Sequence, residues 1–428
     1  MPTAPPVGPP EPSSSQDKHS AFAAFKNRDY SLYQIARLFV ILALEMQSVG
    51  VAWQVYEITR RPLDLGYVGL AQFLPAILLI LIVGHTADRF DRRKIMLVCF
   101  SGYTLCALLL FFYTTRGARP LAVGPIFAIL VFLGVARAFS APTSQAMMPT
   151  LVPDEHFQNA VAWSSSIFQL STIAGPAMAG IIYAAGKGPA QIYKAAVVLF
   201  LLGIGLTLMM RLRTGRLEHR DISIETILAG FKYVWNQKIV LGSISLDLFA
   251  VLLGGAVALL PVYADRVLHV GARGLGVMRS APAVGAAIMG AVLAWRPLRR
   301  RAGLVMFFCV TIFGAATIVF GLSRSFYLSL VMLFAIGASD MVSVVIRGTL
   351  VQVNTPPEMR GRVSAVNMLF IGTSNEFGEF ESGVTAQWLG AVRAVVLGGV
   401  GTLLVVSVWA WKFPELRNVK DLRAKNNS

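Results

Sequence analysis

Three carboxylates stand within nine residues, in the stretch NEFGEFESG at positions 375–383. The flanking runs, VSAVNMLFIGTS and VTAQWLGAVRAVVLGGVG, are apolar enough to lie inside a membrane. On a helix Glu376 and Glu379 lie about 60° apart, whereas Glu381 lies about 140° from Glu376. A carboxylate in a medium of low dielectric is pushed toward its protonated form, and a second carboxylate nearby pushes it further. We therefore expect Glu376 and Glu379 to share a face and to exchange protons. The opposing interpretation is that these acids are static, capping a neighbouring helix or pairing with Arg279.

Other charged residues also lie inside apolar stretches, and these are Glu45, Arg137, Asp247 and Asp340. Charges inside a membrane are costly, so they usually face a cavity or each other. Counted from the nearest basic residue at the membrane edge, Glu45 lies about 12 Å deep and Asp247 about 14 Å deep, at about 1.5 Å per residue. We expect both to lie near the midplane and to bind substrate or protons. For Arg137, proton coupling and simple charge pairing both stay open.

The composition is that of an integral membrane protein. Of the 428 residues, 55% are hydrophobic and 14% are charged, whereas soluble domains carry about 25% charged residues. The net charge of +16 does not indicate nucleic-acid binding, because the basic residues lie in short loops between apolar segments. The three cysteines lie in apolar stretches without paired spacing, and the histidines form no ligand cluster. We expect no metal site and no cofactor.

The hydropathy pattern predicts twelve transmembrane helices, since a helix needs about 20 apolar residues to cross the bilayer. The segments are 32–56, 65–86, 93–114, 121–147, 157–184, 191–211, 239–264, 274–295, 303–322, 326–350, 362–388 and 393–411. Lys and Arg gather in the loops after the second, sixth, eighth and tenth segments and at both ends of the chain. Because such loops stay on the cytoplasmic side, the chain is predicted to be a multi-pass protein of the cell inner membrane with both termini cytoplasmic.

The twelve segments divide into two halves of six that repeat each other. A shift of 207 positions places Gly69 on Gly276 and Pro75 on Pro282. Paired repeats of this kind build many secondary transporters, with the substrate site between the halves. The predicted organisation is a disordered cytoplasmic tail (1–25), a first half (26–211), a cytoplasmic loop with an amphipathic helix (212–238), a second half (239–412) and a cytoplasmic tail (413–428).

Sequence motifs give the chain a family resemblance. The loop GHTADRFDRRK at 84–94 resembles the loop motif of the major facilitator superfamily, although Asp91 stands where glycine is usual. Its motif positions are Gly84, Asp88, Arg89, Arg92 and Arg93. Taken alone, the loop could simply be a basic cytoplasmic connection. A second motif resembles that of antiporters, although Ser171 replaces its leading glycine; its positions are Gly175, Pro176 and Gly180. Arg137 stands where the superfamily has an intramembrane arginine.

Two longer stretches narrow the resemblance. MRGRVSAVNMLFIGTSNEFGEFESG and NRDYSLYQIARLF are similar to the enterobactin-exporter branch of the superfamily, and the likeness covers about residues 26–415. The resemblance implies an all-α membrane protein with the major facilitator fold. In that fold helices 1, 4, 7 and 10 line a central cavity, and helices 2, 5, 8 and 11 join the halves. It also implies that Asp88 contacts the start of helix 11 and acts as a conformational latch.

The function that follows is secondary active transport rather than enzyme catalysis. We expect proton-coupled export of a small amphipathic molecule, siderophore or drug-like, by alternating access. The partners are the substrate, protons and the lipid bilayer, without nucleic acid, and the chain is expected to act as a monomer. It has no GxxxxGK[ST] loop for direct use of ATP. The alternatives are a lysophospholipid or nutrient transporter of the same fold, or a membrane sensor that transports nothing.

Overall fold

The computed structural model describes residues 22–79, 82–83, 86, 90–117, 120–211, 224–296, 298 and 301–419, and within them it is helical without strands. The first half contains α1 (Arg28–Thr59), α2 (Pro62–Leu78), α4 (Arg92–Arg116), α5 (Gly124–Met147), α6 (Phe157–Ile182) and α7 (Gly188–Met209). The second half contains α9 (Lys238–Leu253), α10 (Leu260–Val262), α11 (Gly271–Trp295), α12 (Ala302–Leu322), α13 (Phe326–Val353), α14 (Pro357–Leu389), α15 (Ala391–Lys412) and α16 (Pro414–Arg417). Between them lies α8 (Ile224–Asn236).

Ten membrane-crossing segments are long and apolar enough among the described residues. Two predicted segments, 65–86 and 362–388, are helical but are not among these ten, and the reason differs between them. The described part of α2 has 17 residues, and α14 has 33 residues but carries the three glutamates of NEFGEFESG. The count of twelve spans therefore stays a prediction.

Local sequence signals explain where several helices begin. The Asn27 side chain accepts hydrogen bonds from the backbone N–H groups of Asp29 (2.9 Å) and Tyr30 (3.4 Å) at the start of α1. The Asp91 side chain does the same for Arg93 (2.9 Å) at the start of α4. These caps satisfy backbone donors that have no partner within the helix. Proline at the first position, as in α2 and α14, has no such donor to satisfy.

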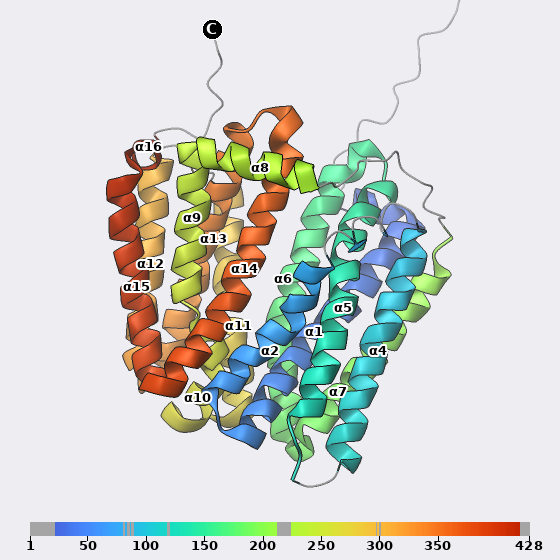
Figure 1. Ribbon diagram of the computed structural model, residues 1–428. Helices are drawn as coiled ribbons and strands as arrows, with labels where there is room; N and C mark the ends of the chain where they lie inside the picture. The colour runs from blue at the N-terminus through green and yellow to red at the C-terminus, as the bar shows by residue number, and fades with distance from the viewer. Residues whose placement is uncertain are drawn as a thin grey trace, which may run out of the picture.

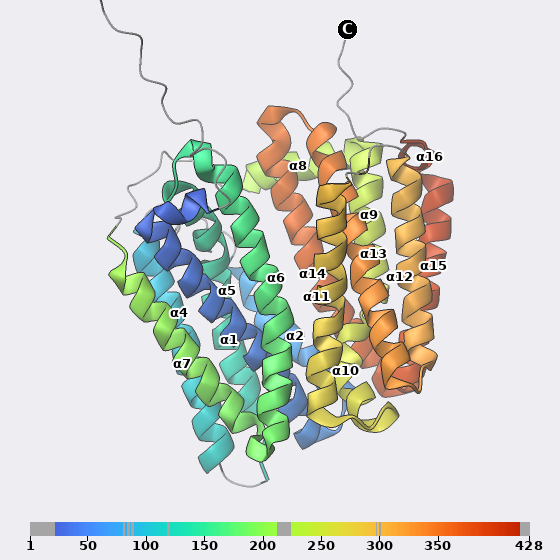
Figure 2. The same cartoon turned by 180° about the vertical axis from the view of Figure 1, so that it is seen from behind.

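The helices form two bundles that lie side by side, with α2 against α14 and α6 against α11 at the contact between them (Figures 1 and 2). Glycines let the backbones approach at these crossings. A Cβ on Gly66 would lie 2.9 Å from the Phe380 Cα, and a Cβ on Gly180 would lie 3.1 Å from the Gly276 Cα. Both crossings lie toward the end of the molecule away from the termini, which we call the closed end.

Charged and aromatic groups also join the halves at the closed end. The guanidinium of Arg60 lies 2.6 Å from the Asp265 carboxylate. The neighbouring Arg266 donates a hydrogen bond of 3.2 Å to the Arg60 backbone carbonyl. Both guanidinium groups face the buried Tyr56 ring, at 5.6 and 5.7 Å from its centroid. Cation–π attraction adds to the ion pair here.

The opposite end, where the termini lie, is hollowed between the halves, and we call it the open end. A cavity of about 630 Å³ is lined there by α1, α5 and α6 on one side and by Ala286, Asp340 and Met341 on the other. The connecting helix α8 lies across the second half at this end (Figure 1). Phe231 packs on Phe370 of α14 with ring centroids 5.4 Å apart, so α8 is fixed to the second half.

Candidate functional site

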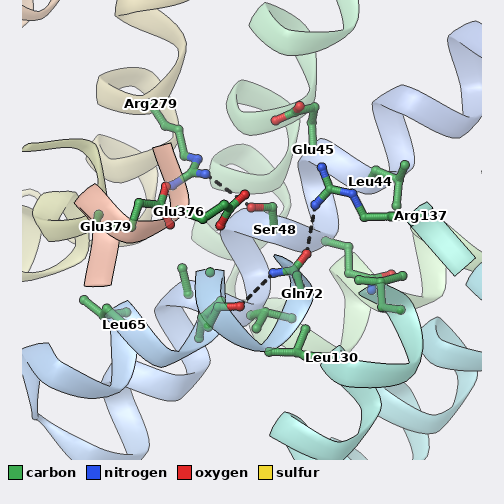
Figure 3. Close-up of a pocket in the computed structure, with 17 residues that line it drawn as sticks. Leu44, Glu45, Ser48, Leu65, Gln72, Leu130, Arg137, Arg279, Glu376 and Glu379 are labelled. Carbon is green, nitrogen blue, oxygen red and sulfur yellow. Dashed lines mark hydrogen bonds between the residues drawn. The ribbon is translucent and has the colours of Figure 1, made fainter. Parts of the chain in front are cut away.

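A polar cavity of about 140 Å³ lies between the two halves, beside the crossing of α2 and α14. Its polar lining comes from five helices and consists of Glu45, Gln47, Ser48, Gln72, Arg137, Arg279, Glu376 and Glu379 (Figure 3). The remaining lining is apolar, including Leu44, Leu65 and Leu130. We call this the central cavity.

Glu376 and Glu379 point at the same place in the central cavity. A Cβ built on Gly69 of α2 would lie 2.7 Å from Oε2 of Glu376 and 2.8 Å from Oε2 of Glu379. The two oxygens are therefore no further apart than the sum of these distances. The Cα hydrogen of a glycine leaves room for both carboxylates, and any larger residue at position 69 would occupy it. The stretch NEFGEFESG thus presents two acids to one small space.

Glu381 is placed differently, as its position on the helix predicts. Its carboxylate accepts a hydrogen bond of 2.7 Å from the hydroxyl of Thr385, one turn along α14. It does not line the central cavity. This residue therefore offers a matched comparison for the other two, because it has the same chemistry on the same helix.

Two arginines provide the positive charge of the central cavity. Arg279 of α11 donates a hydrogen bond to Ser48 Oγ (3.3 Å), and so crosses from the second half to the first. Arg137 of α5 donates to Gln72 Oε1 (3.0 Å), whose amide group in turn donates to the Val68 carbonyl (3.2 Å). Figure 3 shows both guanidinium groups turned into the cavity. Neither is within ion-pair distance of a carboxylate among the described residues.

The charges of the central cavity do not balance. Three carboxylates, Glu45, Glu376 and Glu379, face two guanidinium groups, Arg137 and Arg279. Burying an uncompensated charge costs several kcal/mol. One bound proton, or one bound cationic group, would make the cavity neutral. The arrangement is therefore suited to taking up and releasing one positive charge as its access to water changes.

The antiporter-like motif supports this site from behind. A Cβ on Gly175 of α6 would lie 2.5 Å from the Glu45 Cβ, so α6 approaches α1 closely at the level of that acid. The Pro176 carbonyl and Gly180 face the backbone of α11, where a Cβ on Gly276 would lie 2.5 Å from that carbonyl. Glu45 also lines an adjoining cavity of about 260 Å³ that extends toward the open end along α1 and α5.

Asp247 and Asp340 do not join the central cavity. The Asp247 carboxylate is bound by the guanidinium of Arg347, and both side chains are buried between α9 and α13. Asp340 lies two turns before Arg347 on the same face of α13 and lines the open-end cavity. The structure thus separates Asp247 from Glu45, because a buried arginine on the neighbouring helix holds it inside the second half.

The loop motif is only partly within the described residues. Gly84, Asp88 and Arg89 lie outside them, so the latch contact of Asp88 stays a prediction. Arg92 donates a hydrogen bond of 2.7 Å to the Ala146 carbonyl at the end of α5. Arg93 donates to the carbonyls of Thr207 (3.0 Å) and Leu208 (2.6 Å) at the end of α7. These arginines satisfy the last carbonyls of two helices and favour the negative ends of the helix dipoles.

Some residues of the cavities were not singled out from the sequence. Ser48 and Gln72 hold the two arginines, and the buried Gln47 lines the cavity with both ends of its amide unpaired among the described residues. Arg37 lines the open-end cavity and donates a hydrogen bond of 3.0 Å to the Ser164 carbonyl. For Ser48 the available signal was its place one turn after Glu45 on α1, whereas Gln72 on α2 had no such neighbour.

Comparison with known proteins agrees with this architecture. A family model described as a transmembrane secretion effector matches residues 19–427. The chain belongs to this family of major facilitator transporters. It is a multi-pass membrane transporter and not an enzyme. The predicted fold class, an all-α membrane protein with the major facilitator fold, is confirmed by this membership and by the solved structures that resemble it.

Two named relatives match this chain over most of their sequence. The enterobactin exporter EntS of Escherichia coli (strain K12) is 25% identical over 401 residues, covering 90% of this chain and 92% of that protein. The enterobactin exporter EntS of Citrobacter koseri is 24% identical over 401 residues, with the same coverage.

Two solved structures share its fold. A bacterial homolog of the human lysosomal transporter Spinster, inward-facing and unoccupied, gives a TM-score of 0.68 at 13% identity over 91% of this chain and 98% of that chain. A peptide transporter, POT, gives 0.71 at 11% identity over 92% and 95%.

Proposed function

We propose that this transporter exports a small amphipathic molecule of the siderophore type in exchange for protons. The observation that carries the proposal is the charge imbalance of the central cavity. Glu45, Glu376 and Glu379 outnumber the two arginines there, at the contact between the two halves. A site at this contact changes its exposure to water whenever the halves move relative to one another.

The proton is proposed to bind at the pair formed by Glu376 and Glu379. These carboxylates converge on Gly69 and are flanked by Arg279, which crosses the interface to Ser48. Like charges at such short range favour sharing one proton when water is excluded. Opening the cavity to water lets both acids ionise, and the arginines then hold the negative charge. One cycle of opening and closing would in this way move one proton.

The substrate is proposed to enter from the open end. The cavity there, about 630 Å³, falls within the size range of about 300–1,000 Å³ that is usual for small-molecule sites. Its walls combine apolar groups such as Phe168 and Met341 with polar groups such as Gln145, Gln169 and Arg37. This mixture suits an amphipathic molecule. The siderophore class is taken from the enterobactin exporters that the chain resembles.

The orientation in the membrane is part of the same proposal. The basic loops indicate that the termini, and with them the open end, face the cytoplasm. The described conformation would then be inward-facing, with the ion pair of Arg60 and Asp265 closing the far side. We propose a monomer in the cell inner membrane that alternates between this state and one open to the far side, with Asp88 as the latch of the outward-open state.

The test is uptake into everted membrane vesicles with an acidic interior, in which export becomes uptake. Catecholate siderophores and amphipathic drugs are compared as substrates for the wild type and for Glu376→Gln, Glu379→Gln and Glu381→Gln. We expect gradient-driven uptake by the wild type and by Glu381→Gln, which alters an acid outside the central cavity. It should be lost or strongly reduced in at least one of the other two variants.

The outcomes separate the proposal from its alternatives. Unchanged uptake in both Glu376→Gln and Glu379→Gln, with normal amounts of inserted protein, would contradict the assignment of the proton site. Equal loss in all three variants would point to a general effect of acids on α14. Failure of the wild type to move any of these compounds would contradict the substrate class, and lysophospholipids and nutrients would be tried next, before a sensor without transport is considered.

A further inference from the structure

A second polar cluster lies inside the second half, apart from the central cavity. It consists of Asp247 on α9 and of Ser339, Asp340, Ser343 and Arg347 on one face of α13. Four of these line a small space of about 10 Å³: Asp247, Ser339, Asp340 and Ser343. Apolar residues of α12, Val310 and Phe313, close its other side. The space is about large enough for a single water-sized particle.

The charges of this cluster do not balance either. Two carboxylates, Asp247 and Asp340, face one guanidinium, that of Arg347. The other charged group near Asp340 is Arg37 of α1, which lies across the open-end cavity. Within the second half the cluster therefore carries one uncompensated negative charge in a buried setting, which is costly unless one positive charge joins it.

The oxygen atoms around the space are available to a cation. Arg347 binds Oδ2 of Asp247, and Oδ1 of that carboxylate makes no hydrogen bond among the described residues. The Ser339 hydroxyl donates its proton to helix carbonyls at 2.8 and 3.0 Å, which leaves its oxygen free to accept. Ser343 is 2% exposed, and its hydroxyl lies beside the Asp247 carboxylate without forming a hydrogen bond of good geometry among the described residues. A buried hydroxyl without a well-formed hydrogen bond is uncommon and calls for an explanation.

We propose that this cluster binds one sodium ion, held by the oxygens of Asp247, Asp340, Ser339 and Ser343. Hard cations prefer oxygen ligands, and two carboxylates with two hydroxyls form such a set. A proton on Asp340 would balance the charge but would leave the space between the four oxygen-bearing side chains unexplained. Asp340 lines both this space and the open-end cavity, so a cation can enter from that side.

The experiment measures the melting temperature of the purified full-length protein in detergent as sodium replaces choline at constant ionic strength and pH. The buried thiols of Cys99, Cys106 and Cys309 report unfolding through a thiol-reactive dye. An ion that binds only the folded state raises the melting temperature once the ion concentration exceeds the dissociation constant of the ion. We expect this rise with sodium and not with potassium.

The variants locate the ion. Ser343→Ala removes one ligand and keeps every charge, so the sodium concentration needed for half the effect should rise at least about tenfold. Asp340→Asn should abolish the effect. Ser329→Ala is the control on the same helix, since the hydroxyl of Ser329 bonds Ser323 away from the cluster. Glu376→Gln should keep the sodium response, so this test does not depend on the proton site of the central cavity.

Several results would overturn the sodium site. Equal melting temperatures of the wild type in sodium and in choline would show that no sodium binds. A response that survives both Ser343→Ala and Asp340→Asn, or that disappears in Glu376→Gln, would place the ion elsewhere. A melting temperature that depends on pH but not on sodium would assign the missing charge to a proton.

Discussion

Replacing Gly69 by alanine is expected to displace the two glutamates of the central cavity while leaving the helices in contact. The added Cβ would lie 2.7 Å from Oε2 of Glu376 and 2.8 Å from Oε2 of Glu379, closer than the about 3.3 Å of a normal carbon–oxygen contact. The next nearest atom, the Glu379 Cβ at 3.7 Å, is at ordinary distance. Only the ends of two side chains must therefore move.

The cost of this movement can be bounded. Turning a side chain about 30° away from its preferred rotamer costs about 0.5–1.5 kcal/mol, so two displaced glutamates cost about 1–3 kcal/mol. If this free energy is added to the barrier of the transport step, the transport rate falls by between about fivefold and about a hundredfold. The loss of thermal stability should be at the low end, since no backbone has to shift.

Gly66→Ala is the matched control, one turn earlier on the same helix. Its Cβ would lie 2.9 Å from the Phe380 Cα and 3.2 Å from the Glu379 carbonyl oxygen, and both are backbone atoms that cannot rotate away. This variant must push α2 and α14 apart. We therefore expect a larger loss of stability for Gly66→Ala than for Gly69→Ala, at about 1–3 kcal/mol or more for overpacking.

The assay combines melting curves of the purified variants with vesicle uptake measured at several external pH values. Gly69→Ala should show reduced uptake with an altered dependence on pH and a small change in melting temperature. The reasoning would be refuted if Gly69→Ala transported like the wild type. It would also be refuted if Gly69→Ala were the less stable of the two variants.

Three further predictions concern charges elsewhere. Asp265→Asn removes the ion pair with Arg60, whose side chains are 51% (Arg60) and 29% (Asp265) exposed. An exposed pair contributes no more than about 1 kcal/mol, so its loss should shift the equilibrium toward opening of the closed end by at most about fivefold. Distances between spin labels on the two halves at the closed end would measure this shift. Arg347→Gln leaves Asp247 buried near Asp340 without its positive partner, so stability should fall by about 3–5 kcal/mol, and a nearly unchanged melting curve would contradict the buried pair. Hydrogen bonds from its own backbone and from Lys238, the first residue of α9, hold the pKa of Glu415 below its ordinary value of 4.5. A group with a lowered pKa stabilises the fold above its unfolded pKa, and this stabilisation is lost as the pH falls through its folded pKa. The stability difference between the wild type and Glu415→Gln should therefore vanish in acid, as melting curves below pH 4.5 would show.

The sequence predicts most helices within a few residues, because long apolar runs have few alternatives in a membrane. The predicted segment 93–114 is the helix Arg92–Arg116, and 303–322 is Ala302–Leu322. The predicted segment 239–264 matches the membrane-crossing segment Lys238–Val267, but within it α9 ends at Leu253 before Gly254 and Gly255. The chain then continues through short helical turns to Val267. A glycine pair weakens a helix, and Pro261 cannot donate the hydrogen bond that would continue it.

The candidate site was only partly predictable. Helical spacing alone places Glu376 and Glu379 on one face, and the structure places both in the central cavity. Spacing within one helix cannot tell which residue of another helix lies opposite. For this reason the sequence did not pair Asp247 with Arg347, 100 positions further along the chain. It also did not point to Ser48 and Gln72, because uncharged polar residues in apolar helices are too common to stand out.

The two glycine-lined crossings of the closed end, α2 with α14 and α6 with α11, have a mechanical consequence. Two bodies that touch at two points can rotate about the line through those points while both contacts persist. At each crossing backbone meets backbone, so the helices can pivot there in close contact, while the ring pairs Tyr67–Phe380 and Phe73–Phe377 between α2 and α14 shift past one another. The central cavity lies beside this line. Its walls would therefore move by small amounts while the open end moves by large ones, and the position of a bound proton would be nearly fixed as the entrance changes sides.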